Sequence, residues 1–460
     1  MIINRLNKSI LLGVLFLYSL PNLTIAQDLD NYIREGIKNN IVLQQKSISL
    51  KQALYSLKIA QSYYLPSSNL QGNYTTGEGG RFIPLPIGDL LNPVYSTLNQ
   101  MTNSKAFPII ENEEIGFFPH DFYDVKLHTT FPIVNTDIYY NQKIQRLQVK
   151  LKEYELNLYK RELIRNIKTA YFNFLSASLE VKIYGRAIDI LTENVRITQV
   201  LLQNGKGLAA YYLRSQSEKE KVIIQFNNAQ NDENNGKKYF NFLLNRNLIS
   251  NIDTVFAIED FKLEKLINSL SLTNDSLREE LLMLETGEKI SHLSVKMNQS
   301  YITPKISCFL DLGMQNQNWK FNDKSRYYLA GFQLDFPIFN GGKNSYKIKQ
   351  SVLEYKNAQL NYENNKQQFQ LSNEIVKNNL FSAWHTYQVS LHQLKSAQSY
   401  FNLIDKGYKE GVYSQIEFLD ARNQLTSAEL MLGINKYKVM IEIANVERET
   451  ADVDLNSLNE

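Results

Sequence analysis

The sequence has almost no cysteine, since Cys308 is the only one among 460 residues. A single cysteine excludes a disulfide framework within the chain and any metal cluster built on cysteine ligands. The five histidines are scattered without the paired spacing of a metal site. No glycine-rich phosphate loop of the P-loop or dinucleotide type is present, and no nucleophile has a base nearby. The sequence therefore predicts no metal, no cofactor and no enzymatic activity.

The chain also has a small net charge and few long apolar runs. A net charge of +3 is small for 460 residues and argues against a nucleic-acid partner. Beyond residue 26 no run of about 18 apolar residues occurs, so no membrane-spanning helix is predicted. Residues 1–26 combine a basic start, an apolar run from Ile10 to Leu20 and small residues before Gln27. This pattern predicts a secretory signal peptide that is cleaved after Ala26.

Very long helices dominate what the sequence does contain. The stretch from Gly342 to Lys406 has no proline, and as one helix it would be about 100 Å long at 1.5 Å per residue. Its apolar residues recur at alternating steps of three and four, which is typical of a helix packed on other helices. These residues are Leu380, Trp384, Tyr387, Leu391 and Leu394, followed by Phe401, Ile404 and Tyr408. A glycine turn is predicted over 407–411, and a last helix from Ser414 to Thr450.

The same plan occurs twice in the chain. The strand exit FPIVN at Phe131 corresponds to FPIFN at Phe336, and the turn glycine Gly207 corresponds to Gly411, with offsets of 205 and 204 residues. A period this long indicates a duplicated half rather than a solenoid of small units. We therefore expect a first structural repeat over 27–247, a connector over 248–275, a second repeat over 276–450 and a loose tail over 451–460.

Each half also contains two candidate strands in which apolar and polar residues alternate. The clearest runs from Tyr123 to Phe131, and the others lie at 69–74, 305–314 and 328–336. Alternation fits a barrel wall that is apolar towards lipid, and equally a half-buried strand of a soluble sheet. The chain is rich in aromatic residues, with 28 Tyr and 23 Phe, which suits an interface between lipid and water. Four strands cannot close a membrane barrel, which needs about eight, so the sheet edges must pair with other chains.

The remaining segments give weaker signals. One helix is expected over 28–62, ending before Pro66, and others over 211–247, 263–270 and 276–300. Residues 76–121 have no clear period apart from an amphipathic piece near 87–98. A loop of this length is either functional or poorly ordered.

The order of elements, twice helix, two strands, long helix, tip and helix behind a signal peptide, resembles the TolC family of outer-membrane efflux proteins. The residues that carry the resemblance are Pro66 and Pro304, the two strand exits, Tyr171, the Ala383-Trp384 pair, and the tips GKGLAA and KEGVYSQIEFLDA. The resemblance implies a mainly α fold with a small β part. A duplicated long-helix coiled-coil barrel would continue four strands per chain, which contribute to a trimeric twelve-stranded transmembrane β-barrel.

The resemblance also implies a function. The chain would form a homotrimer in the outer membrane, with its helical part in the periplasm. It would be the passive exit duct of a tripartite efflux system, served by a periplasmic adaptor and an inner-membrane pump, through which small molecules or drugs pass unchanged. One alternative is the exit duct of a type I protein secretion system. An alternative of a different class is a periplasmic coiled-coil adaptor or scaffold without a barrel.

Two acidic residues, Glu417 and Asp420, fall where the family carries acids that ring the pore near its closed end. Residues three apart share a helix face, so threefold symmetry would create two stacked rings of carboxylates at a pore constriction. Both acids could equally be solvated charges near a helix N-terminus, where negative charge is favoured.

The family also implies that the hairpin tips contact the adaptor. The tip residues are Gly207, Leu208, Ala209, Gly411, Val412 and Ser414. A plain hairpin turn that needs glycine explains part of this set too. The chain departs from the family at Leu213 and Tyr413, where some members have an acidic residue and an arginine that link the tips. Packing of Tyr408 and Tyr413 would substitute for those polar links.

Overall fold

The computed structural model describes residues 24–118, 120–254, 260–270, 278–452 and 455. The chain divides into two compact units, one formed by residues 1–50, 151–285 and 361–460, the other by 51–150 and 286–360. Each unit takes segments from both predicted repeats, whose boundaries stay a prediction. The predicted signal peptide lies outside the described residues except for 24–26, and so does most of the predicted tail.

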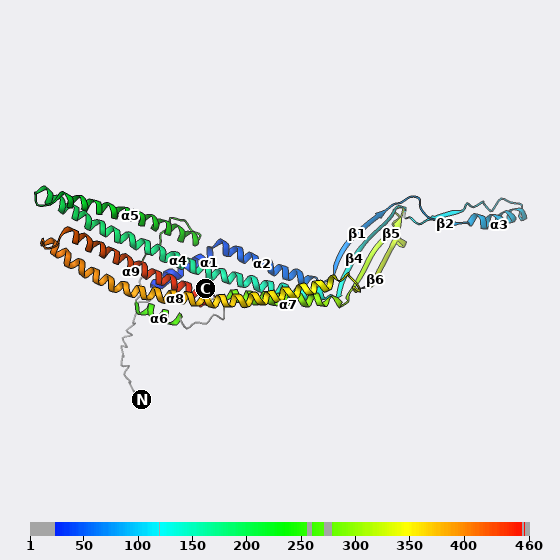
Figure 1. Ribbon diagram of the computed structural model, residues 1–460. Coiled ribbons are helices and arrows are strands. Elements are labelled where there is room, and N and C mark those ends of the chain that lie inside the picture. Colours follow the sequence, from blue (N-terminus) through cyan, green and yellow to red (C-terminus); the bar gives the residue numbers. More distant parts are fainter. Residues whose placement is uncertain (1–23, 119, 255–259, 271–277, 453–454, 456–460) are drawn as a thin grey trace, which may run out of the picture. The chain divides into compact units, whose positions relative to one another are not determined.

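The second unit contains a four-stranded antiparallel sheet (Figure 1). Its strands are β1 (Ser67–Thr75), β4 (Phe122–Val134), β5 (Lys305–Gln317) and β6 (Arg326–Asp335), in the order β1-β4-β5-β6. The four predicted strands are confirmed. The register places apolar residues in rows across the sheet; in one of them Leu127 lies between Leu70 and Leu312. Within the described residues, β1 and β6 are sheet edges with no further strand beside them.

Two helices of nearly equal length follow the strands. They are α4 (Thr136–Gln203, 68 residues) and α8 (Lys343–Lys409, 67 residues). The side chain of Asn135 accepts the N–H of Asp137 at 3.0 Å and so starts α4. Gly341 and Gly342, with φ of 56° and 76°, allow the chain to turn from β6 into α8. The predicted long helices are thus confirmed.

The predicted glycine turn at 407–411 begins too early. Helix α8 continues to Lys409, with Gly407 inside it. Gly411 ends the helix in the left-handed conformation, with φ of 80°, and donates to the carbonyl of Tyr408, while Val412 donates to that of Gly407 at 2.8 Å. These two bonds form a Schellman motif. Gly205, with φ of 68°, ends α4 in the same way.

The expected single helix over 28–62 is wrong, because the structure has two. Helix α1 (Thr24–Asn39) and helix α2 (Ile41–Ser62) are separated at Asn40. The Asn40 side-chain oxygen accepts the N–H of Leu43 at 3.0 Å and caps α2. Asparagine competes with the helical backbone in this way, and periodicity does not reveal it.

Residues 76–121 contain regular elements where the structure describes them. Strands β2 (Phe82–Leu85) and β3 (Glu113–Gly116) pair, and α3 (Ile87–Met101) lies between them in sequence. Asn92 exchanges two hydrogen bonds of 2.9 Å with the backbone of Ile110. Asn99, two turns later, does the same with Phe107 at 2.8 and 3.1 Å. These amides fasten the returning chain along α3.

Two further helices, α5 (Ala209–Leu243) and α9 (Gln415–Thr450), complete the hairpins α4 with α5 and α8 with α9, which lie side by side in the first unit (Figure 1). The remaining helices are α6 (Asp260–Leu270) and α7 (Glu279–Gln299), with short 3-10 turns at Ser300–Ile302 and Asp323–Ser325. The predictions for these segments are confirmed to within a few residues. The expected helix start at Ser276 lies outside the described residues.

The core of the first unit lies between the hairpins. Ile167, Phe240 and Val439 are fully buried there, and Leu380 and Tyr387 of the predicted stripe are 2% and 3% exposed. A second cluster near the tips includes Leu191, Ile404 and Phe418, with Phe401 and Tyr408 packed against it. The stripe predicted from the three-four spacing therefore faces the helical core.

No helix among the described residues is both long enough and apolar enough to cross a membrane.

Candidate functional site

One face of the sheet exposes apolar side chains. Val125, Leu310 and Phe332 are 43%, 40% and 79% exposed, and Leu127 is 41% exposed. Burying apolar area is worth about 25 cal/mol per Å², so a contiguous face of this kind needs an apolar cover. Within a single chain, this apolar face is therefore not buried in a protein core. From Tyr123 to Ile133 the face extends about 33 Å along the strand, or about 25 Å in height at the tilt usual for membrane barrels.

An aromatic cluster bounds this face at the end of the sheet where β1 ends and β4 begins. The Trp319 ring stacks between Tyr74 and Tyr123, with centroid distances of 5.3 and 5.7 Å. Phe321 packs on Tyr123 at 4.8 Å, and the Tyr74 hydroxyl donates to Asp121 at 2.6 Å. Rings with an apolar body and a polar tip are typical of the edge of a bilayer.

The opposite face of the sheet is polar and its charges are paired. Asp311, 3% exposed, accepts from Lys126 at 3.2 Å and is bonded through its other oxygen to Nδ1 of His128. The Tyr327 hydroxyl donates to Asp124 at 2.7 Å. The sheet is thus apolar on one side and hydrophilic on the other, which suits a wall between lipid and water.

The two hairpin tips expose apolar side chains. Leu208, which precedes α5, is 60% exposed, and Val412, which precedes α9, is 72% exposed. Gly207 lies so close to the end of α4 that a Cβ there would be 3.0 Å from Leu201 and from the backbone of Leu202. The predicted tip residues therefore form tight turns that present one large apolar group each. Contact with an adaptor stays a prediction.

Glu417 and Asp420 are both exposed on the first turns of α9. The Glu417 carboxylate accepts from the N–H and the hydroxyl of Ser414, and these bonds hold the pKa of Glu417 below its ordinary value. Asp420 accepts from the Gln424 amide at 2.7 Å. The structure thus places Glu417 in a helix cap, which fits the alternative of a charge near a helix N-terminus. A ring of carboxylates requires other copies of the chain and stays a prediction.

Two tyrosines pack near the second tip, and their role as a substitute for polar links stays a prediction. The Tyr413 ring lies on Gly407, where a Cβ would be 2.4 Å from it. Tyr408 stacks on Phe418 with a centroid distance of 4.8 Å, and its hydroxyl accepts from Asn194 at 3.4 Å. Burial raises the pKa of the Tyr408 phenol. Leu213, the other departure from the family, is 61% exposed.

A buried polar cluster behind the tips was not predicted. Ser215 and Gln415 are 0% and 3% exposed, and Asn194 is 2% exposed. The Gln415 amide donates to the carbonyl of Tyr211 at 2.9 Å and to the Ser215 hydroxyl, which donates to Asn194 at 2.7 Å. The cluster joins α9, α5 and α4. Heptad spacing could have indicated that Ser215 is buried, because it precedes the buried Val222 by seven residues and so lies on the same helix face.

Arg422 on α9 is also buried, with 1% of its surface exposed. Among the described residues, its Nε and Nη2 atoms have no hydrogen-bond partner, and neither has Oε2 of Glu218. Burial lowers the pKa of the Arg422 guanidinium, and the charge of Glu218 offsets part of this effect. Sequence reasoning missed this residue because a charged residue inside a helical repeat is usually solvated.

Among the residues that the structure describes, no three His, Cys, Asp or Glu side chains gather closely enough to hold a metal ion. His385 and His392 are exposed on α8.

Comparison with known proteins adds three kinds of similarity. The family model of the outer membrane efflux proteins matches residues 278–447. The outer membrane protein TolC of Escherichia coli (strain K12) is 22% identical over 330 residues, which span 65% of this chain and 62% of that protein. TolC of Salmonella enteritidis is 19% identical over 95% of this chain and 84% of that protein. The crystal structure of the Campylobacter jejuni CmeC outer membrane channel has a TM-score of 0.75 at 17% identity, covering 98% of this chain and 93% of that one.

Proposed function

Because the chain belongs to the TolC-like family of outer membrane efflux proteins and is an outer-membrane protein, we propose that it is the passive exit duct of a tripartite efflux system. Small molecules or drugs would cross the outer membrane through it without chemical change. The observation that carries this proposal is the four-stranded sheet, apolar and exposed on one face and polar on the other. Among the described residues, no further strand pairs with either of its edges.

Those open edges support a homotrimer. An unpaired strand edge exposes backbone donors and acceptors that must be paired in a bilayer. Pairing β6 of one copy with β1 of the next would join four strands from each of three copies into a closed twelve-stranded barrel. The long helices α4 and α8 would continue it as a tunnel in the periplasm.

The pump and the adaptor are partners in this proposal. The duct has no energy source of its own, so an inner-membrane pump must drive transport, and a periplasmic adaptor would meet the tips at Leu208 and Val412. Export of proteins by a type I system would use the same kind of duct and differs only in the pump. A scaffold without a barrel is disfavoured, because it has no use for a sheet face that exposes Val125 and Phe332.

We further propose that Glu417 and Asp420 of three copies line the pore constriction. Both carboxylates are exposed and three residues apart on α9. Stacked rings of three carboxylates would attract cations and repel anions.

Membrane fractionation tests the proposal directly. The full-length protein should be recovered from the outer-membrane fraction as a trimer that dissociates on heating, and it should conduct ions in planar bilayers. A soluble periplasmic monomer without conductance would contradict the proposal. Identifying the neighbouring pump genes separates efflux from protein secretion.

A further inference from the structure

All four long strands connect to helices at one end of the sheet. Ser67 at the start of β1 lies opposite Thr130, Val134 at the end of β4 opposite Ile306, and Lys305 opposite Asp335. The residues that lead into or out of this end are 51–66, 136–150, 289–305 and 335–350. We call them the junction segments. All of them belong to the second unit.

The junction segments carry a strong excess of positive charge. They contain eleven lysine and arginine residues and two acidic ones, Asp137 and Asp335, whereas the whole chain has a net charge of only +3. Asp137 is already paired with Lys305 at 2.5 Å. The ten other cations are exposed. This end of the sheet is therefore basic, whereas the rest of the chain has a net negative charge.

Exposed tyrosines accompany these cations. Lys143 lies 4.2 Å from the ring centroid of Tyr139, Lys58 lies 5.5 Å from that of Tyr55, and Lys349 lies 5.8 Å from that of Tyr346. The three tyrosines are 44%, 64% and 69% exposed, in the order Tyr139, Tyr55 and Tyr346. Tyrosine and lysine side by side are typical of the bilayer interface, where the ring meets the acyl boundary and the ammonium meets phosphate.

The position of a polar cavity shows which side of the helices these groups occupy. The cavity has a volume of about 660 Å³ and is lined by Lys305 and Asp335 from the polar face of the sheet, by Asp137 and Asn141 of α4, and by Asn344 and Lys347 of α8. At about 100° per residue, Tyr139 and Lys143 lie on the side of α4 opposite Asp137 and Asn141.

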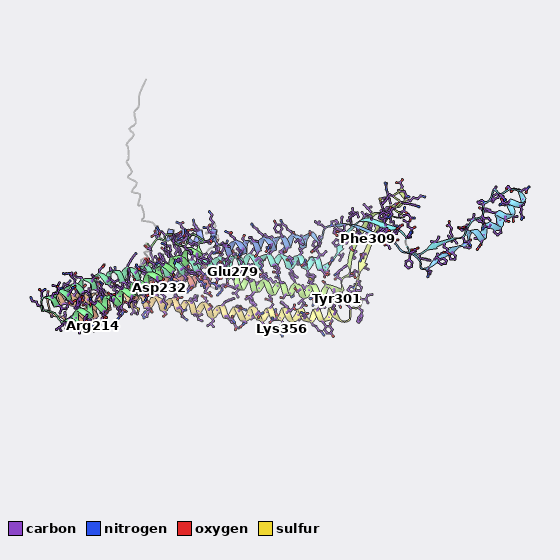
Figure 2. All side chains as sticks on the ribbon, turned by 90° about the horizontal axis from the view of Figure 1, so that it is seen from above. Arg214, Asp232, Glu279, Tyr301, Phe309 and Lys356 are labelled. Atoms are coloured by element: carbon purple, nitrogen blue, oxygen red, sulfur yellow. The ribbon has the colours of Figure 1, made fainter. Side chains whose placement is uncertain are left out.

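Further cations continue these outer sides. Arg146 and Lys150 follow Lys143 at helical spacing on α4, and all three are exposed. On α8, Tyr346 and Lys349 likewise lie opposite the cavity residues, and Lys356, labelled in Figure 2, follows them. The aromatic and basic stripes thus lie on the side of the apolar sheet face rather than on the side of the polar cavity.

We propose that this surface binds the headgroups of anionic phospholipids in the leaflet where the strands leave the bilayer. We call it the basic collar and define it by Lys58, Lys143, Arg146, Lys150 and Lys349. It rests on the proposed function, because it needs the apolar sheet face to be in the membrane. The collar lies on the helices that lead out of that end of the sheet, and its charge is opposite to that of a phosphodiester headgroup.

Native mass spectrometry of the full-length protein tests this proposal. The protein in detergent is incubated with phosphatidylglycerol or with phosphatidylcholine at equal concentration, and the retained lipids are counted. The collar variant is Lys143→Gln, Arg146→Gln and Lys150→Gln. The matched control, Lys366→Gln, Lys395→Gln and Lys406→Gln, removes three exposed lysines from the part of α8 in the other unit.

The wild type should prefer phosphatidylglycerol by roughly ten-fold, and the collar variant should lose at least about five-fold of that preference, since each cation near a membrane surface contributes measurably. The control should retain it. Equal retention of the two lipids, or an equal loss in the control, would overturn the collar. An unchanged lipid preference together with lost adaptor crosslinking would assign the surface to the adaptor and also overturn it.

Conductance separates this result from the proposed function. In bilayers of phosphatidylcholine alone, the collar variant should conduct like the wild type, which leaves the duct intact whatever the lipid preference is. A wild type that conducts in no bilayer would instead count against the duct itself.

Discussion

The carboxylate of Glu417 accepts hydrogen bonds from the backbone N–H of Ser414 at 2.7 Å and from its hydroxyl at 2.8 Å, and the Ser414 hydroxyl oxygen accepts the N–H of Glu417 at 3.3 Å. This capping box starts α9. Glu417 therefore has a local structural role beside the proposed role in the pore. A test of its charge has to preserve the cap.

The double substitution Glu417→Gln and Asp420→Asn meets that requirement, because glutamine also serves in a capping box. It removes both proposed rings of charge and should weaken cation preference and block by trivalent cations in planar bilayers. The reversal potential in a salt gradient measures the preference. An unchanged reversal potential would refute the rings.

The control for this experiment is Ser414→Ala, which leaves both acidic residues and removes the hydroxyl of the cap. It should cost about 1 kcal/mol of helix stability and leave the reversal potential unchanged. If it alters ion selectivity as much as the double substitution does, the selectivity reports the shape of α9 and not the charge.

A charge at the first tip should prevent adaptor docking. Leu208→Asp places a favoured N-cap residue before α5, so the helix should keep its stability while the exposed apolar contact is lost. Crosslinking to the adaptor should disappear while the trimer stays intact on gels. Leu403→Asp, at a position 67% exposed on α8, is the control and should crosslink normally. Normal crosslinking of Leu208→Asp would exclude this contact.

Acid should weaken the first unit through a buried ion network. Arg278, 3% exposed, donates to Glu280 at 3.0 Å and to Glu449 at 2.5 Å, and Arg448 bonds the same two carboxylates at 2.9 and 2.6 Å. Burial by itself would raise the pKa of Glu280, but the bonds and charge of Arg278 outweigh it and lower that pKa below its ordinary value. The stabilisation is therefore present above the unfolded pKa of about 4.3 and is lost as pH falls through the folded pKa.

Two variants distinguish the contribution of Arg278 to this ion network from that of Glu280. Arg278→Met leaves two buried carboxylates with less compensation and should cost about 3–5 kcal/mol at pH 7, as measured by urea unfolding followed by circular dichroism. Glu280→Gln should also be less stable at pH 7, but it should lose less stability than the wild type on acidification from about pH 5 to 3. An identical acid response in wild type and Glu280→Gln would show that other groups cause it.

The amide contacts of the insert make a local prediction. Asn92→Leu removes both side-chain hydrogen bonds to Ile110. The backbone N–H and C=O of Ile110 then lose these partners, at a local cost of about 2 kcal/mol. Amide hydrogen exchange should accelerate near Ile110 while conductance is unchanged. Gln100→Leu, an exposed change on the same helix, should leave the exchange rates as they are. Equal rates in both variants would mean that the returning chain is held by other contacts.

The sequence predicts regular elements well here because their periods are long and repeated. The three-four stripe through Leu380 and Tyr387 and the alternation around Val125 each report which face meets apolar surroundings. The break at Asn40 was missed, because a single side-chain hydrogen bond decides it. Ser215, Gln415 and Arg422 were missed for a related reason: a polar residue in an apolar stripe is satisfied, or left unsatisfied, only by partners from distant helices.

The Gln415 amide ties α9 to α5 within a single chain, out of reach of water. Separating the two hairpins would strip this amide and the Tyr211 carbonyl of their bond before solvent could replace it, and such a step is costly. The hairpins of one chain are thus expected to move together, so that in the proposed trimer any widening of the tip region would take place between neighbouring subunits.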